Sequence, residues 1–323
     1  MSRILTIGEP MVLFAADELG PLYEINHFTK YLAGSEVNVS IGLKRLNHDV
    51  TYVTKLGNDP FGKYIYNFLQ HERIDTSHVM FDDKYPTGFQ IKGKTLKGDP
   101  DVFYFRKGSA ASHVSIKDIK TIDFAKYDHI HLTGIFPALS DITRETIYEI
   151  LKISEDKGIQ ISFDPNLRPT LWKSQEYMIQ TINDIAFHCN IVLPGIQEGL
   201  ILTGSDDHEK IADFYLEKGT SIVAVKLGEN GAFVKTKNEK FYVKGYKVAR
   251  VVDTVGAGDG FAVGFISAIL EGLPIKEAAM RGNAIGSLQV MTPGDNDGLP
   301  NRYQLENYIR EKGENNENTI SNR

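Results

Sequence analysis

The strongest chemical signal in the chain is a glycine-rich turn that leads into an apolar helix. The run 253–260 reads Asp-Thr-Val-Gly-Ala-Gly-Asp-Gly, and mostly apolar residues follow it as far as 270. Glycine lets the backbone turn sharply, and the first N–H groups of a helix, with the positive end of its dipole, attract an anion. We therefore predict that the backbone N–H groups of Gly256, Ala257 and Gly258 bind a phosphate and stabilise charge that develops on a phosphoryl group.

Asp259 stands beside this predicted anion hole, where the helix begins. A carboxylate there can take the proton from a hydroxyl that attacks phosphorus, so Asp259 is our candidate general base. The alternative is structural, because aspartate is also preferred at helix N-termini. Dinucleotide binding is excluded by spacing, since Gly-x-Gly-x-x-Gly from Gly256 would need a glycine at Phe261. A Walker-type phosphate loop is absent from the sequence as well.

Charge and composition narrow the class of protein. The 323 residues include 36 Lys and Arg against 42 Asp and Glu, a formal charge of −6, so we expect no nucleic-acid partner and no anionic membrane partner. The sequence has no apolar run of about 18 residues that would span a bilayer, and its N-terminus does not read as a signal peptide. Cys189 is the single cysteine, which fits a reducing compartment. We expect a cytoplasmic protein.

The elements that must position these residues alternate between strands and helices. Helical runs such as 36–46, 61–71 and 144–157 are separated by short β-rich runs, which lie at 4–7, 50–53, 129–132, 159–163, 191–193 and 222–225. Repeated strand–helix–strand units require right-handed crossovers and give a mostly parallel sheet covered on both faces. We predict an α/β fold with three layers, α/β/α, whose ligands bind at the C-terminal ends of the strands.

Two segments interrupt the alternation, at about 11–32 and about 87–106. The second reads as paired strands at 88–92 and 102–105, joined by the turn residues Lys97-Gly98-Asp99-Pro100. Neither segment is long enough for a domain, so together they predict a small β-sheet lid, whose exposed edges favour a homo-oligomer paired through the lid. We assign 1–310 to the main domain and the polar residues 311–323 to a disordered tail.

Three ordered motifs, collinear from about residue 3 to 300, resemble the PfkB (ribokinase-like) sugar kinases. The run 253–264 resembles the C-terminal signature of that family. The run 33–40, with 55–62 after it, resembles the N-terminal signature, and 225–232 resembles the strand and loop on the nucleotide side. The N-terminal motif departs from the family at Glu36, where a small residue is usual, and at Asn47, where glycine is usual.

The resemblance implies a ribokinase-like fold and an ATP-dependent carbohydrate kinase, with magnesium bridging the nucleotide phosphates. Glu198 would organise the magnesium shell, although the usual Asn-x-x-Glu begins here with Gly195; a solvated helix acid is the alternative. The resemblance also implies nucleotide-binding residues, which would be Asn166, Lys226, Gly228, Gly231, Gly256 and Gly258.

Longer and rarer runs resemble the 2-keto-3-deoxygluconate kinases within this family: 8–11, 34–38, 104–112, 163–168 and 293–300. This implies phosphorylation of the terminal (6-) hydroxyl of 2-keto-3-deoxygluconate. The implied sugar-binding residues are Gly34, Asn38, Phe89, Tyr104, Arg106, Arg168 and Asp295, with Phe89 where a tyrosine would be expected. Independently, an arginine fork suits the carboxylate of a sugar acid, and Arg106 on the lid and Arg168 after a strand are placed for it.

Each of these assignments has a structural alternative. Phe89 and Tyr104 could fill the lid, Arg106 could lie on its surface, Arg168 could pair with an acid in its own loop, and Asp295 could be a turn residue. The rival functions are a fructokinase or ribokinase of the same family and a non-catalytic sugar-binding regulator, which the intact Gly-Ala-Gly-Asp disfavours. The C4 epimer accepted, the oligomeric state and any monovalent-cation dependence stay open.

Overall fold

The computed structural model describes residues 2–95 and 100–320, and side chains as far as residue 312. Its central sheet has nine strands: β1 (Arg3–Ile7), β4 (Asp49–Gly57), β5 (Val79–Asp82), β8 (His129–Thr133), β9 (Gln160–Asp164), β10 (Ile191–Val192), β11 (Ile222–Lys226), β12 (Ala232–Thr236) and β13 (Lys240–Val243). Their order is β13-β12-β11-β10-β9-β8-β1-β4-β5. The strands from β11 to β5 pair in parallel, and β12 and β13 add an antiparallel edge.

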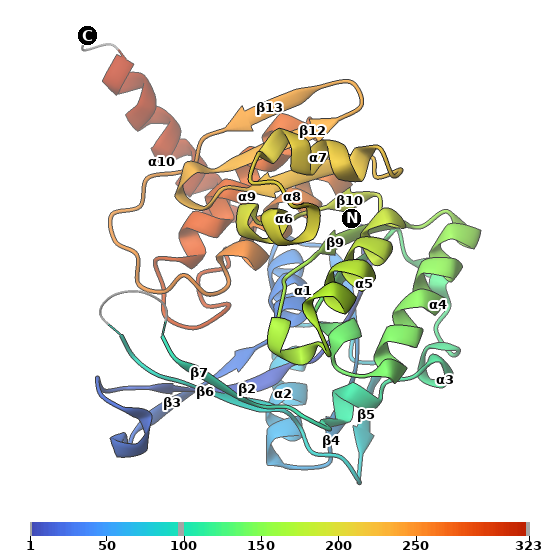
Figure 1. The fold of residues 1–323 in the computed structure, drawn as a ribbon. Helices are drawn as coiled ribbons and strands as arrows, with labels where there is room; N and C mark the ends of the chain where they lie inside the picture. The colour runs from blue at the N-terminus through green and yellow to red at the C-terminus, as the bar shows by residue number, and fades with distance from the viewer. Residues whose placement is uncertain (1, 96–99, 321–323) are drawn as a thin grey trace.

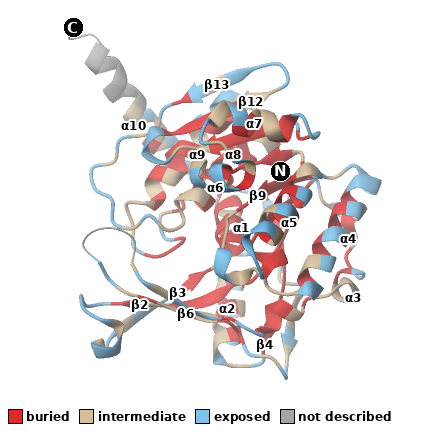
Figure 2. Ribbon diagram, viewed as in Figure 1, coloured by how far each residue is buried: buried red, intermediate tan, exposed pale blue. Residues whose placement is uncertain are grey.

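Helices cover both faces of this sheet (Figure 1). One face packs against α1 (Ser35–Arg45), α2 (Pro60–His71), α8 (Ala257–Leu270), α9 (Ile275–Gln289) and the start of α10 (Arg302–Ile320). The other packs against α3 (Ile116–Ile119), α4 (Asp141–Lys157), α5 (Gln175–Phe187), α6 (Ile196–Thr203) and α7 (His208–Leu216). Each face has its own apolar core, and Figure 2 shows burial concentrated in the inner strands and inward helix surfaces. The predicted three-layer α/β/α fold is confirmed.

Short 3-10 helices occur in the connections: η1 (Leu22–Glu24), η2 (Ala110–His113), η3 (Phe124–Lys126), η4 (Phe136–Ala138), η5 (Pro169–Leu171) and η6 (Gly228–Asn230). Within the described ranges, no helix combines the length and apolarity needed to cross a bilayer.

The predicted lid sheet is present. It comprises β2 (Met11–Ala16), β3 (Phe28–Ala33), β6 (Phe89–Lys92) and β7 (Val102–Phe105), in the order β3-β2-β6-β7. The sheet lies beside one end of the central sheet and projects away from it (Figure 1). β6 and β7 pair with each other, as predicted from the sequence; the pairing is antiparallel, with Phe89 opposite Phe105. The predicted turn between them includes 97–99, which lie outside the described residues.

The C-terminal segment contains α10, which continues as far as Ile320, and the disorder expected for 311–323 stays a prediction. Its first turns are held by buried Leu305 and by Tyr308, whose hydroxyl lies 2.8 Å from the Ser287 hydroxyl. A helix that is already nucleated adds residues at little cost, so even a polar run can continue it. Residues 321–323 lie outside the described residues.

Candidate active site

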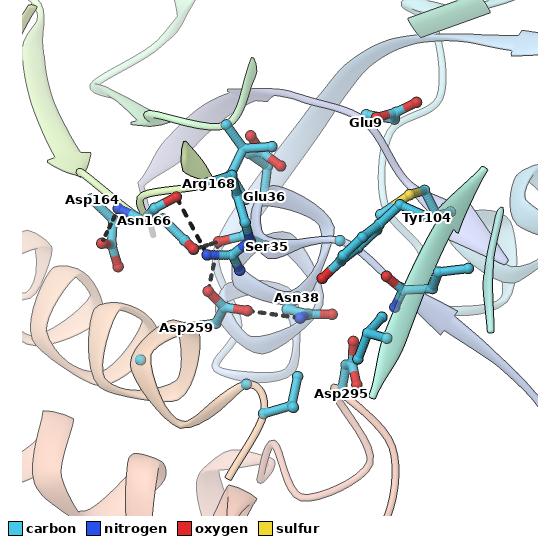
Figure 3. Close-up of a pocket in the computed structure, with 18 of the residues that line it drawn as sticks. Glu9, Ser35, Glu36, Asn38, Tyr104, Asp164, Asn166, Arg168, Asp259 and Asp295 are labelled. Atoms are coloured by element: carbon cyan, nitrogen blue, oxygen red, sulfur yellow. Dashed lines mark hydrogen bonds between the residues drawn. The ribbon is translucent and has the colours of Figure 1, made fainter. Parts of the chain in front are cut away.

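A pocket of about 350 Å³ lies between the C-terminal ends of the central strands and the lid. Figure 3 shows Asp259, Asn38, Ser35 and Asn166 on one side of it, and Tyr104 and Asp295 on the other. Its wall contains twelve of the residues that the sequence proposed: Gly34, Asn38, Tyr104, Arg106, Asn166, Arg168, Glu198, Lys226, Gly256, Gly258, Asp259 and Asp295. The fold therefore brings together segments that are far apart in the chain.

Asp259 lies in the first turn of α8 and is buried. One carboxylate oxygen accepts a hydrogen bond from the Ser35 hydroxyl at 2.6 Å, and the other accepts one from the Asn38 amide at 2.7 Å. Burial raises the pKa of Asp259 to about 6, although the bonds from Ser35 and Asn38 oppose the rise. A carboxylate with a pKa near 6 is ionised at neutral pH and basic enough to accept a proton.

Two further side-chain amides orient the residues that bind Asp259. The Asn166 amide donates to the Ser35 hydroxyl at 2.8 Å. The Asn296 amide donates to the side-chain oxygen of Asn38 at 3.1 Å, which leaves the Asn38 nitrogen facing Asp259. Because an amide presents its donor and acceptor on opposite sides, this contact selects the orientation of Asn38.

The glycine-rich turn has the geometry of an anion site. Gly256 has a left-handed φ of 81°, and α8 begins directly after it, at Ala257. A side chain at Gly256 would collide with the carbonyl oxygen of Asp295. The N–H of Ala257 makes only a long contact, 3.4 Å, with the Thr254 carbonyl, and the dipole of α8 adds to the attraction of its first N–H groups for an anion.

Lys226, at the end of β11, lies beneath this turn. Its ammonium is 2.6 Å from a carboxylate oxygen of Asp164, at the end of β9. Burial acts to lower the pKa of Lys226, but Asp164 and Glu198 outweigh it and raise the pKa. Lys226 therefore stays charged, and an atom added at Gly258 would lie 3.3 Å from its nitrogen.

Glu198 lies in the first turn of α6 and faces the same ammonium. Its two oxygens accept the backbone N–H groups of Leu167 at 2.8 Å and Gly195 at 2.7 Å. Burial raises the pKa of Glu198, while Lys226 and these backbone bonds lower it. The contact with the Gly195 N–H needs no side chain, so Glu198 keeps its place although Gly195 replaces the usual asparagine.

The donor set around Glu198 bears on magnesium. Among the described residues, no three His, Cys, Asp or Glu side chains gather as a ready-made metal cage. Magnesium in kinases instead keeps several waters and takes one or two carboxylates together with substrate phosphates. Each Glu198 oxygen accepts one N–H and retains a second lone pair, and Asp164 lines the same pocket. These residues fit a hydrated magnesium ion.

The two proposed arginines differ in their partners. Arg106 is buried and bonded to the carboxylate of Glu9 at 2.6 Å, so its charge is already compensated. Glu9 also accepts from the Ser109 hydroxyl. Arg168 is half-buried, and its described hydrogen bonds go to the backbone oxygens of Leu167, at 2.9 Å, and Asn166, at 3.5 Å. Arg168 therefore carries the less compensated positive charge. Neither structural alternative matches: Arg106 is buried rather than on the surface, and the described hydrogen bonds of Arg168 go to carbonyls rather than to an acid.

The predicted sugar-binding role of Phe89 does not agree with its position in the structure. Phe89 lines neither this pocket nor the cavity beside it, and lies instead on the face of the lid turned away from the pocket, here called the outer face. There it packs against Phe61 of α2, and its ring stacks on Phe105 with centroids 4.6 Å apart. Alternate residues of a strand point to opposite faces, so Gln90 and Lys92 face the pocket in its place. On β7 the same alternation turns Tyr104 inward, below the Arg106 guanidinium.

A second cavity of about 460 Å³ adjoins the pocket and shares Lys226, Thr254 and Gly258 with it. The proposed nucleotide residues Gly228 and Gly231, and Ala257 of the anion turn, line this cavity. Much of its remaining wall is apolar, contributed by Tyr246, Val248, Val251, Phe261 and Val290. An apolar wall beside an anion site suits a flat aromatic base joined to phosphates.

Sequence reasoning missed several residues of the site. Ser35 and Asp164 lie inside motifs that the sequence analysis had recognised. Their position beside predicted site residues could therefore have indicated a role in the site. Glu36 departs from the family pattern, and the structure shows why the fold accepts it. Its side chain lies against Gly8, where a Cβ would collide with it, and accepts the Thr133 hydroxyl at 2.6 Å. Burial raises the pKa of Glu36 to about 7. Gln90 and Lys92 had no signal beyond the strand alternation.

Comparison with known proteins agrees with this geometry. Residues 1–302 match the family described as pfkB family carbohydrate kinase. The chain is 48% identical over 306 residues to a 2-dehydro-3-deoxygluconokinase of Bacillus subtilis (strain 168), and the match covers 94% of each protein.

Solved structures give the same picture. A PfkB protein from Polaromonas sp. JS666 superposes with a TM-score of 0.87 at 44% identity, covering 95% of this chain and 99% of that one. A putative ribokinase II from E. coli, in complex with ATP and Mg²⁺, superposes with a TM-score of 0.89 at 26% identity, covering 96% and 100%.

Proposed function

The chain belongs to the pfkB family of carbohydrate kinases, and from this premise we propose that it transfers a phosphoryl group from ATP to 2-keto-3-deoxygluconate, which is also called 2-dehydro-3-deoxygluconate. The acceptor is the terminal hydroxyl and the product is the 6-phosphate. The observation that carries the proposal is the hydrogen-bonded Asp259 beside the anion turn, in a pocket that also presents Arg168.

The oxygen of the sugar 6-hydroxyl attacks the terminal phosphorus of ATP, and Asp259 takes the proton of that hydroxyl. Ser35 and Asn38 hold the carboxylate so that it faces the hydroxyl. The N–H groups of Gly256, Ala257 and Gly258 stabilise the charge that develops on the phosphoryl oxygens, and Lys226 adds a fixed positive charge at the boundary of the two cavities. The part of ATP that leaves as ADP lies in the second cavity.

ATP enters as a magnesium complex in this proposal. Glu198 and Asp164 would hold the ion, which would neutralise charge on the nucleotide phosphates. The support is the donor set of these two acids at the pocket wall.

The carboxylate of the sugar acid is assigned to Arg168 rather than to Arg106. Arg168 has carbonyl partners only among its described hydrogen bonds, so its fork can take a carboxylate without breaking an ion pair. Arg106 is joined to Glu9, and Tyr104 lies below its guanidinium, so this pair shapes the lid wall of the pocket. Gly34, Asn38 and Asp295 complete the sugar side.

A coupled assay of ADP release tests the proposed function. The acceptors are 2-keto-3-deoxygluconate, its C4 epimer, 5-dehydro-2-deoxygluconate, fructose and ribose. We expect the highest kcat/KM with 2-keto-3-deoxygluconate, and phosphorus NMR of the product should place the phosphate on the terminal carbon. A clear preference for fructose or ribose would replace the sugar acid, and absence of ADP release with every acceptor would favour a non-catalytic role.

Charge variants test the carboxylate assignment. Arg168→Ala should lower kcat/KM for the acid about tenfold to a hundredfold and should affect a neutral sugar much less. Arg106→Ala combined with Glu9→Gln removes the lid ion pair without leaving a buried charge, and should affect acid and neutral substrates alike. Arg3→Ala is the matched control, because Arg3 begins β1 and the pocket lies at the C-terminal ends of the strands. Equal losses on both substrates with Arg168→Ala would reject the assignment.

We also propose that two copies pair through their lids. The edge strands of the lid sheet are β3 and β7, and β7 exposes Phe103 and Phe105 on the outer face at 55% and 52%. Exposed edges and aromatic side chains of this kind favour pairing between chains. Phe103→Lys should shift the mass in sedimentation equilibrium toward the monomer, and a monomeric wild type would contradict the pairing.

A further inference from the structure

Lys92 is the last residue of β6, and its ammonium is buried between two carboxylates of the main domain. The residue is only 5% exposed. Its nitrogen lies 2.7 Å from an oxygen of Asp253 and 3.2 Å from an oxygen of Asp295. Asp253 precedes the anion turn, and Asp295 belongs to the loop that follows α9. The lid is therefore joined to the main domain by ion pairs from one ammonium to two carboxylates, and Lys92 and Asp295 line the pocket.

Both acids also shape the anion turn. The second carboxylate oxygen of Asp253 accepts the backbone N–H of Val255 at 3.0 Å, which closes a small ring at the start of the turn. The carbonyl of Asp295 lies against Gly256, where it leaves no room for a side chain. The two residues that hold Lys92 through their carboxylates thus also contact the turn that leads into α8.

The charge balance makes this contact a strong constraint. Burial acts to lower the pKa of Lys92, but Asp295 and Asp253 outweigh it and raise the pKa, so the ammonium stays charged. Removing one partner of a buried ion pair leaves an uncompensated charge, which is costly. Without the ammonium, Asp253 and Asp295 would repel each other across the turn that they hold.

We infer that Lys92 is a positioning residue for phosphoryl transfer: it holds the turn 253–258 in the geometry that receives the phosphoryl group, and it makes that geometry depend on the lid lying over the sugar. The inference rests on the proposed function only in requiring transfer from ATP to a sugar, whichever sugar that is. In this arrangement the anion hole is complete when the lid is in place, which disfavours transfer to water before the sugar has bound.

A direct role for Lys92 as a ligand of the sugar carboxylate makes a different prediction. Loss of a substrate ligand should raise KM for an acid and spare a neutral sugar. Loss of a positioning residue should lower kcat for every sugar that the enzyme accepts, with a small change in KM. The two roles are therefore separable by the split between kcat and KM.

The experiment uses the full chain and whichever sugar the wild type phosphorylates best, so failure of the 2-keto-3-deoxygluconate assignment does not affect it. Lys92→Met should lower kcat about tenfold to a hundredfold and change KM for the sugar less than about threefold. Asp253→Asn should give a similar loss. The double variant should be no worse than either single one, because the two residues act through one contact. Lys92→Arg should recover part of kcat.

The matched control is Lys94→Met. Lys94 is an exposed lysine two residues further along, and it donates to the Asp17 carbonyl at 2.7 Å. Its removal should leave kcat and KM unchanged. A rise in KM for acids with kcat preserved, additive losses in the double variant, or kcat within threefold of wild type for Lys92→Met would each overturn the inference. Should Lys92→Met fail to fold, Lys92→Arg and Asp253→Asn carry the same comparison.

Discussion

At Asp259, burial and hydrogen bonding act on the carboxylate in opposite directions. Burial disfavours the charge, and the bonds from Ser35 and Asn38 favour it. The balance leaves the pKa near 6, about two units above that of an ordinary aspartate. Such a group accepts a proton more readily than a solvated aspartate does and is still ionised at neutral pH.

Asp259→Asn tests that role. Asparagine has nearly the same shape and cannot accept the proton, so kcat should fall by about 10²–10⁴ while ATP and sugar still bind. The measurements are steady-state kinetics and calorimetric binding. Asp156→Asn, an exposed change on α4, is the control and should leave kcat intact. A kcat for Asp259→Asn within threefold of wild type would remove Asp259 from the mechanism.

The pH profile tests the same carboxylate independently. Because the base must be ionised, kcat/KM should decline as the pH falls through about 6. Ser35→Ala removes a bond that lowers the pKa, so the acid limb should move to higher pH. An acid limb that stays in place, or moves to lower pH, would show that another group controls the decline.

At the scale of the element, the turn before α8 depends on a glycine in a left-handed conformation. Gly256→Ala adds both backbone strain and a collision with the Asp295 carbonyl. Gly272→Ala adds comparable strain, at a φ of 74°, and meets nothing within 4 Å. Both variants should lose about 1 kcal/mol or more of unfolding free energy, and only Gly256→Ala should also lose kcat, about tenfold or more. If Gly256→Ala and Gly272→Ala have equal kcat values, the geometry of the turn does not contribute to catalysis.

The sequence predicted most elements because their signals are local. Asp59 and Pro60 mark the start of α2, and the Asp59 side chain does accept the Gly62 N–H at 2.8 Å. Phe89 shows the limit of such reasoning: the strand was predicted, but which of its faces meets the pocket depends on how β6 pairs with β2 and β7. The Glu9–Arg106 and Lys92–Asp253 contacts join residues 97 and 161 positions apart, and no local pattern predicts them.

At the scale of the whole molecule, the first turns of α10 pack against the face formed by α8 and α9. Leu305 and Tyr308 are the buried residues near its start. Removal of residues 313–323 should therefore change the melting temperature by less than about 2 °C. Leu305→Ala should cost about 2–5 kcal/mol, seen in urea unfolding. A large loss on truncation would mean that the distal part of α10 contributes to the fold.

The two cavities share Lys226, Thr254 and Gly258 in their walls. A single synthetic molecule in which adenosine is linked through a phosphate chain to the terminal carbon of a sugar acid would lie in both at once. Binding of one half would place the other at an effective concentration in the millimolar range for a short linker. The affinity of such a conjugate would then measure how closely the enzyme holds its two substrates in register, without a catalytic turnover. The linker length that binds tightest would report the separation at which the enzyme holds the two reacting ends.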